Sequence, residues 1–214
     1  QEEDPVKNLI RAAAVTASAI ALVGGAATAA HAVNYDIKVN GGYTPNPANV
    51  KLTSVGAVGL STPLISWGCT SSSGMASLKV GASVPSPHAS ISSFALTGCT
   101  WPGGLPMNVT TSAGWNLSIT GGGPTVWNAT ITGIAAHVVD AVGGTTCAFD
   151  VTGSVNGSFD EGTQDLTITS SSLTVSNMTG GCLGLIANGD PLTTAATYHV
   201  TNPATGLTWP IDIS

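Results

Sequence analysis

The sequence predicts an all-β protein, with an antiparallel β-sandwich or barrel-like fold of about eleven short strands. Three observations support this prediction. Apolar residues alternate with Ser, Thr, Asn and Asp along most of the chain, which is the period-two pattern of half-buried strands. Clusters of Gly, Pro and Asn interrupt the alternation at intervals of roughly 8–15 residues, as in sandwiches and barrels. After the first 32 residues no amphipathic helical stretch of useful length occurs.

The predicted strands follow from this alternation. In the first of them Tyr35, Ile37 and Val39 share one face, and Asp36 and Lys38 share the other. The same reasoning predicts strands over 34–40, 49–55, 64–69, 75–80, 91–99, 108–112, 115–120, 125–140, 147–157, 165–169, 172–176 and 193–200.

Breaks in the alternation predict the connections between strands. The polar run 70–74 is expected to be a loop, and residues 183–191 are the stretch that could form a helical turn. Within 125–140 the apolar phase changes at Gly133, so a bulge or a bend is expected there.

The first 32 residues have the pattern of a cleaved secretory signal peptide. Lys7 and Arg11 supply positive charge, residues 12–27 form an apolar run rich in small residues, and Ala30-His31-Ala32 fits the A-x-A cleavage site. A transmembrane anchor is the alternative. It fits poorly because the run is short, is broken by glycines and lacks a stop-transfer charge after it.

Residues 33–214 are therefore expected to form a single secreted all-β domain. The acidic residues 1–5 precede the positive segment and lack an initiator Met. One explanation is a start at Val6, which would make residues 1–5 a start-site artefact. After signal cleavage no membrane span is expected.

Charge excludes one class of partner. Residues 33–214 contain three lysines, no arginine and eight acidic residues, a net charge of −5. Such a surface repels phosphate backbones and anionic lipids, so nucleic-acid binding is not expected.

Four cysteines, Cys69, Cys99, Cys147 and Cys182, indicate disulfides formed in an oxidising compartment. Because no C-x-x-C spacing occurs, no metal site is expected, and no cofactor motif is present. Four cysteines allow three pairings. The sequential pairing is favoured because both intervals contain strands that can return, and each second cysteine follows a glycine. It would create two cysteine-closed units, 69–99 and 147–182.

Two stretches resemble a known group of proteins. Residues 173–200 contain Gly181-Cys182, Gly184-Leu185, Gly189-Asp190-Pro191 and Tyr198-x-Val200, and residues 96–110 read LTGCTWPGGLPMNVT. Both are similar to parts of actinobacterial secreted, four-cysteine, β-rich hypothetical exported proteins of unknown function. The resemblance implies an exported β protein and no particular chemistry.

No catalytic motif occurs. His137 and Asp140 could suggest an acid–base pair, but residues three apart on a strand point to opposite faces. G-x-S-x-G and H-E-x-x-H are absent. A triad assembled from distant residues stays open.

The acidic cluster Asp160, Glu161 and Asp165 could bind Ca²⁺ through its oxygen atoms, but EF-hand spacing is absent. The favoured interpretation is a solvated hairpin loop.

Two tryptophans are candidate ligand-binding residues. Trp101 and Trp209 lie in expected loops next to proline, where exposed rings could stack on sugars. Trp115 and Trp127 keep phase with apolar neighbours and are expected in the core.

The sequence thus favours a secreted or cell-surface protein with a structural or interaction role and no catalysis. The sequence does not identify the partner, and a cell-wall or extracellular glycan or protein is the candidate. A carbohydrate-binding module is the alternative, and an unrecognised secreted hydrolase comes third.

Overall fold

The computed structural model describes residues 33–141 and 146–214, so the predicted signal peptide and its cleavage site at Ala32 lie outside the described residues. Within them the chain forms thirteen strands and one short 3-10 helix. In chain order they are β1 (Tyr35–Val39), β2 (Ala48–Ser54), β3 (Val58–Ser61), β4 (Ser66–Leu78), β5 (Gly81–Val84), β6 (Ala89–Trp101), β7 (Leu105–Thr111), β8 (Trp115–Gly122), β9 (Val126–Asp140), β10 (Ala148–Asp160), β11 (Asp165–Thr179), η1 (Gly181–Gly184), β12 (Pro191–Thr201) and β13 (Ile211–Ile213).

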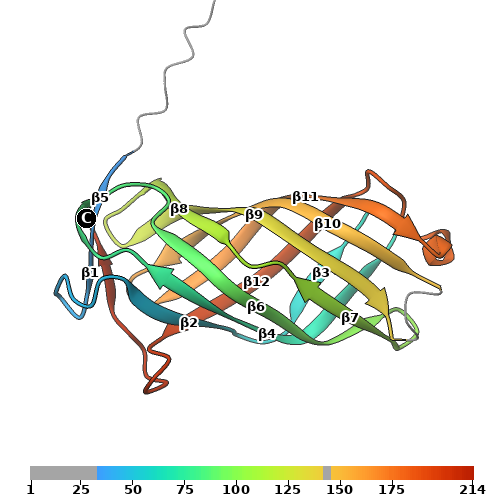
Figure 1. Cartoon of the computed structure of the whole chain (residues 1–214), viewed down its shortest axis with the longest axis horizontal. Coiled ribbons are helices and arrows are strands. Elements are labelled where there is room, and N and C mark those ends of the chain that lie inside the picture. The colour runs from blue at the N-terminus through green and yellow to red at the C-terminus, as the bar shows by residue number, and fades with distance from the viewer. Residues whose placement is uncertain (1–32, 142–145) are drawn as a thin grey trace, which may run out of the picture. The chain divides into compact units, whose positions relative to one another are not determined.

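Ten of these strands form a closed antiparallel barrel with eight strand positions (Figure 1). β2 and β3 share one position, since both pair with β4 and with β12, and β7 and β8 share another between β6 and β9. Each position pairs with the next along the chain. The barrel closes where Val200 of β12 faces Leu52 of β2. The all-β prediction is confirmed, and the sandwich alternative is wrong because the sheet joins its own edge.

Two predicted interruptions are absent. The polar run 70–74 is part of β4, where Ser71 and Ser73 pair with Thr97 and Ala95 of β6. It is a strand because the barrel exterior faces solvent, where Ser and Thr are as suitable as charged residues. Likewise, 165–169 and 172–176 form one strand, β11, with a register shift between them. The three short strands β3, β5 and β13 have too few residues to show a period, and the alternation did not predict them.

The predicted change of phase in β9 is confirmed. Gly133 has a φ of +74°, and the register between β9 and β10 shifts beside it. The bulge switches the inward side chains from Ile131 to Ile134, which keeps both halves of the long strand facing the core.

Apolar side chains fill the barrel and polar ones cover it. In β2, for example, Val50 and Leu52 are buried while Asn49, Lys51 and Thr53 are exposed. Burial of the inner face is the main favourable term for a sheet that contains few ion pairs.

The three-stranded sheet β13-β1-β5 packs at one end of the barrel. Ile211 and Ile213 of β13 line a cavity of about 60 Å³ together with barrel residues such as Phe159 and Val200. Tyr35 of β1 packs edge-on against Trp127 of β9, with ring centroids 5.3 Å apart. This end is therefore covered by apolar side chains.

The opposite end contains the two disulfides and an aromatic cluster. Trp67 packs on Trp101 with ring centroids 5.2 Å apart, and Phe149 contacts both rings. Cys69 of β4 is bonded to Cys99 of β6, opposite each other in the ladder.

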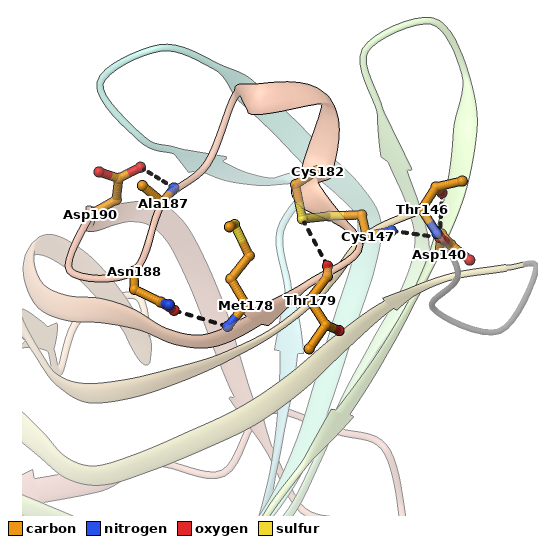
Figure 2. Close-up of a disulfide and its surroundings, with 9 residues drawn as sticks. All are labelled: Asp140, Thr146, Cys147, Met178, Thr179, Cys182, Ala187, Asn188 and Asp190. Carbon is orange, nitrogen blue, oxygen red and sulfur yellow. Dashed lines mark hydrogen bonds between the residues drawn. A yellow bond between two sulfur atoms is a disulfide. The ribbon is translucent and has the colours of Figure 1, made fainter.

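The second disulfide joins Cys147, just before β10, to Cys182 in η1 (Figure 2). The sequential pairing is thus confirmed. Buried Asp140 accepts hydrogen bonds from the backbone N–H groups of Thr146 and Cys147, both at 2.8 Å, which fixes the chain that leads into this bridge.

Candidate functional site

The most distinctive feature of the barrel is an internal cavity of about 110 Å³. It lies between inward-facing side chains of every barrel strand position. The lining residues are Leu52, Val58, Leu60, Trp67, Ile91, Phe94, Leu96, Val109, Thr111, Trp115, Ile131, Ile134, Ala136, Val138, Val151, Val155, Leu166, Ile168, Leu173, Leu192, Thr194 and Tyr198. None of these residues is charged. Barrels of eight strands are just wide enough to be filled by side chains or to hold one small ligand.

The few hydroxyl groups in the cavity wall already have partners. Thr194 donates to the Gly59 carbonyl at 3.1 Å, and Thr111 donates to the Phe94 carbonyl. The buried Tyr198 hydroxyl accepts a hydrogen bond from Ser72 at 3.1 Å. Burial raises the pKa of Tyr198, so the phenol stays neutral. The surface presented to a guest molecule is therefore almost entirely apolar.

A groove of about 500 Å³ lies on the barrel wall, outside this cavity. β3, β4, β11 and β12 form it. Its lining residues are Gly59, Leu60, Ser61, Ser66, Trp67, Thr169, Ser170, Ser171, Thr193, Thr194 and Ala195. Leu60, Trp67 and Thr194 line both spaces, so the groove and the cavity are separated by these side chains.

The groove lies over a break in the backbone ladder. β11 and β12 pair up to Ile168 opposite Ala196, and again from Leu173 opposite Leu192. Between these points the Ser171 hydroxyl donates to the Leu192 carbonyl at 3.0 Å and accepts from the Thr194 N–H at 3.2 Å. Side-chain hydrogen bonds thus replace the missing strand pairing.

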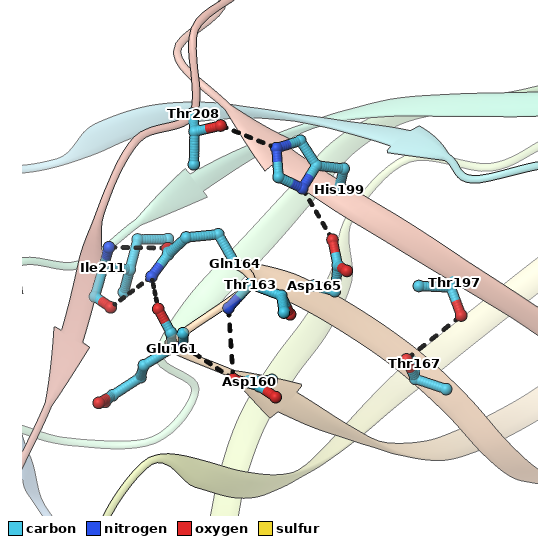
Figure 3. Close-up of polar contacts among 11 residues, drawn as sticks. Asp160, Glu161, Thr163, Gln164, Asp165, Thr167, Thr197, His199, Thr208 and Ile211 are labelled. Carbon is cyan, nitrogen blue, oxygen red and sulfur yellow. Dashed lines mark hydrogen bonds and ion pairs between the residues drawn. The ribbon is translucent and has the colours of Figure 1, made fainter.

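A second arrangement of interest lies outside the barrel interior (Figure 3). His199 Nδ1 lies 2.7 Å from Asp165 Oδ1, and His199 Nε2 lies 3.0 Å from the hydroxyl of Thr208. This order of carboxylate, imidazole and hydroxyl is the one found in catalytic triads. Thr208 is exposed, however, and neither His199 nor Thr208 lines the cavity or the groove. We interpret the arrangement as a link between β12 and the segment that follows it.

The acidic cluster is used for structure. Asp160 accepts hydrogen bonds from Gly162 and Thr163 in the β10–β11 turn (Figure 3). Glu161 Oε1 accepts from Trp127 Nε1 at 2.8 Å and from the Ile213 N–H at 2.6 Å. Asp165 contacts His199. In the described part of the chain no group of three or more His, Cys, Asp or Glu side chains is placed to hold a metal ion.

The candidate ligand-binding residues Trp101 and Trp209 are not exposed. Only 3% of Trp101 and 8% of Trp209 is accessible, and both belong to the core. The prediction that their loops expose them is wrong, because burial of a large ring outweighs the turn-forming tendency of the neighbouring Pro and Gly. Trp115 and Trp127 are in the core, as predicted.

His137 does not pair with Asp140. Its Nδ1 lies 2.5 Å from Asp150 Oδ1, directly across the ladder between β9 and β10. Asn177 donates to the other Asp150 oxygen at 2.7 Å, and the hydrogen bonds from Asn177 and His137 lower the pKa of Asp150. This surface pair explains the histidine without a catalytic role.

The alternation of apolar residues does not predict the cavity, because a cavity depends on which inward-facing side chains leave space between them. The one residue that indicates a cavity is Ala136, a small side chain at an inward-facing position of β9 among larger apolar residues.

Comparisons with known proteins give no further guide. No protein-family model matches the chain, no curated protein matches it, and no solved structure matches it. Among the described residues, no helix has the length and apolar character needed to cross a membrane.

Proposed function

We propose that this chain is a non-catalytic binding protein that holds one small apolar molecule inside its barrel. The observation that carries the proposal is the cavity lined by uncharged, almost wholly apolar side chains. An apolar cavity of about 150 Å³ in another protein is known to stay dry and to take benzene, so a space of about 110 Å³ is of the right order.

Export is part of the same proposal. Two disulfides and the absence of free cysteines among the described residues fit an oxidising compartment, outside the cytoplasm or at the cell surface. We extend the proposal to kinship with actinobacterial exported proteins, on the basis of the resemblance in residues 96–110 and 173–200.

The carbohydrate-binding alternative depends on exposed rings on which a sugar could stack, and Trp101 and Trp209 are buried. A purely structural role at the cell surface does not need an internal cavity. For these reasons ligand binding is the function that the geometry supports best.

Toluene is a suitable probe, because it is apolar and close to benzene in size. Trp67 and Trp115 line the cavity, so toluene bound there should change the intrinsic tryptophan fluorescence and raise the unfolding temperature. We expect saturable binding to wild-type protein with both readouts.

A pair of variants on β9 supplies the control. Ala136 lines the cavity, whereas its neighbour Ala135 does not and lies in the opposite phase. Ala136→Leu should abolish toluene binding by filling the space, and Ala135→Leu should leave it intact. Absence of saturable binding to the wild type, or equal binding by the Ala136→Leu variant, would contradict the proposal.

A further inference from the structure

We propose that the wall groove is a second subsite, which binds the uncharged, hydroxyl-bearing head of an amphiphile whose short apolar tail occupies the internal cavity. This inference rests on the proposed function and identifies the class of ligand. The groove lining consists of Gly59, Leu60, Ser61, Ser66, Trp67, Thr169–Ser171 and Thr193–Ala195.

The first argument is continuity between the two spaces. Leu60, Trp67 and Thr194 each line both the groove and the cavity. Leu60 and Thr194 are only half-buried, which places their side chains at the boundary between the two spaces. A chain molecule that displaces the Leu60 side chain would pass from one space into the other.

The second argument is the interrupted strand pairing in the barrel wall beneath the groove. Between Ile168 and Leu173 the backbone pairing of β11 with β12 is interrupted, and the Ser171 side chain bridges the strands instead. The pairing of β6 with β8 and β7 is also interrupted, between Ile91 and Cys99, but that stretch does not line the groove. A tail can therefore enter here at the cost of one side-chain rearrangement, without opening a ladder.

The third argument is the chemistry of the groove. Ser61, Ser66 and Thr193 contribute hydroxyl groups from one side, and Thr169 and Ser170 contribute them from the other. Hydroxyl groups both donate and accept hydrogen bonds, so they match the hydroxyl groups of an alcohol or a sugar.

Charge selects against ionic heads. None of the three lysines of residues 33–214, Lys38, Lys51 and Lys79, lines the groove, and the chain is acidic overall. A sulfate, phosphate or carboxylate would lose water there without gaining an opposite charge, which is unfavourable. A neutral head avoids that cost.

The sizes of the two spaces agree with this assignment. At about 500 Å³, the groove falls within the range of small-molecule sites, whereas the cavity of about 110 Å³ admits only a slender group. The ligand class is therefore a neutral amphiphile with a polar head larger than the part of its tail that is enclosed.

Three probes test the inference: hexyl β-glucoside with a neutral head, hexyl sulfate with an anionic head, and toluene with none. Their dissociation constants would be measured by titration calorimetry and tryptophan fluorescence. We expect hexyl β-glucoside to bind wild-type protein at least about tenfold more tightly than hexyl sulfate.

Gly59 offers a way to block the groove. A Cβ atom added there would have the Ala195 carbonyl oxygen as its nearest neighbour, at 3.9 Å, so a larger side chain fits. Gly59→Leu should weaken binding of hexyl β-glucoside about tenfold or more and change that of toluene less than about twofold. Gly42→Leu is the matched control, since its Cβ would also meet only a carbonyl oxygen at 3.9 Å, far along the chain from the groove.

Ser170→Leu, at an exposed position in the groove, is a second blocking variant in case Gly59→Leu does not fold. The inference is overturned if toluene binds while hexyl β-glucoside shows no preference over hexyl sulfate. It is also overturned if the blocking variants weaken the glucoside no more than Gly42→Leu does. Those results would not contradict the proposed function. Failure of toluene itself to bind would contradict both the proposed function and this inference.

Discussion

The side-chain amide of Gln164 forms two hydrogen bonds with the backbone of Ile211 (Figure 3). The Ile211 N–H donates to Gln164 Oε1 at 2.8 Å, and Gln164 Nε2 donates to the Ile211 carbonyl at 3.0 Å. Gln164 is in the turn between β10 and β11, and Ile211 begins β13. The buried Gln164 side chain therefore connects the three-stranded sheet β13-β1-β5 to the barrel. It does so with the same kind of hydrogen bonds that a neighbouring strand would form with Ile211.

Replacement of Gln164 tests that role. Gln164→Leu leaves the N–H and the carbonyl of Ile211 without partners in a buried position, so we expect a loss of about 2–4 kcal/mol in the free energy of unfolding. Urea unfolding monitored by tryptophan fluorescence measures it. Gln164→Glu keeps an acceptor for the Ile211 N–H but turns a carboxylate oxygen toward the carbonyl oxygens of Ile211 and Glu161, so it should lose as much or more at neutral pH. Equal stability of Gln164→Leu and wild type would show that the pairing is not needed.

Glu161 makes stability depend on pH in a definite direction. Burial raises the pKa of its carboxyl group, against the hydrogen bonds from Ile213 and Trp127, and nearby Asp212 and Asp160 act in the same sense as burial. The folded state then holds the proton at a pH where the unfolded chain has released it. Stability from this group is therefore lost as pH rises from about 4.5 through the raised pKa.

Glu161→Gln keeps an oxygen acceptor for Trp127 and Ile213 and cannot ionise. The stability of this variant relative to wild type should increase as pH rises from about 4.5 toward neutrality, as measured by urea unfolding at each pH. A relative stability that is flat over this range would contradict the assignment.

His88 should give the opposite dependence in a different range. It is fully buried, and its Nδ1 accepts a hydrogen bond from the Ile119 N–H at 3.0 Å. Burial, and then the positive charge of Lys79, lower its pKa. The unfolded chain therefore takes up the proton first, and stability is lost as pH falls from 6.5 through the lowered pKa.

His88→Asn can retain an acceptor for Ile119 and does not titrate near neutral pH. We expect it to be less stable than wild type above pH 7, because packing against the Tyr35 ring is lost. Below pH 6.5, the ordinary pKa of histidine, the difference in stability between the variant and wild type should decrease. Thermal unfolding from pH 8 to 5 measures this, and a gap of constant size would rule out the titration of His88.

The alternation of apolar residues was sufficient to predict most strands, yet not how the sheet closes. Closure depends on contacts such as Val200 with Leu52, far apart in the sequence, which a local period does not report. The loop predicted over 70–74 was wrong for a related reason. A Cβ atom at Gly74 would lie 2.7 Å from the Phe94 ring, so this glycine marks a close cross-strand contact and not a turn.

The candidate site was less predictable than the fold. The groove depends on a missing stretch of pairing between β11 and β12, and Ser171 gives no local sign of its bridging role. Asp165, His199 and Thr208 come together only because β11 pairs with β12 and the chain then turns back. Their sequence positions alone show no motif.

The disulfide between Cys147 and Cys182 should contribute strongly to stability. It closes an interval of 35 residues, which corresponds to about 4 kcal/mol in the chain-entropy model. Cys147→Ala with Cys182→Ala should lower the free energy of unfolding by about this amount. The Cys69–Cys99 bridge closes a similar interval, 30 residues, so its double alanine variant should lose nearly as much. A loss below about 1 kcal/mol for either double variant would mean that the chain-entropy model overestimates the contribution of that disulfide to stability.

The last prediction concerns catalysis by Thr208. His199 Nε2 lies 3.0 Å from the Thr208 hydroxyl, and Asp165 is 2.7 Å from Nδ1, so the hydroxyl has a base and the base has an orienting carboxylate. Catalysis also requires a pocket that holds the substrate near the nucleophile, and Thr208 lies outside both the cavity and the groove. We therefore expect no covalent labelling of Thr208 by a fluorophosphonate and no hydrolysis of p-nitrophenyl acetate above the level of the Thr208→Val variant. The same variant should cost less than about 1.5 kcal/mol in stability, the net value of one hydrogen bond. A fluorophosphonate adduct on Thr208 by mass spectrometry, lost in His199→Asn, would instead establish a nucleophile and overturn the non-catalytic assignment.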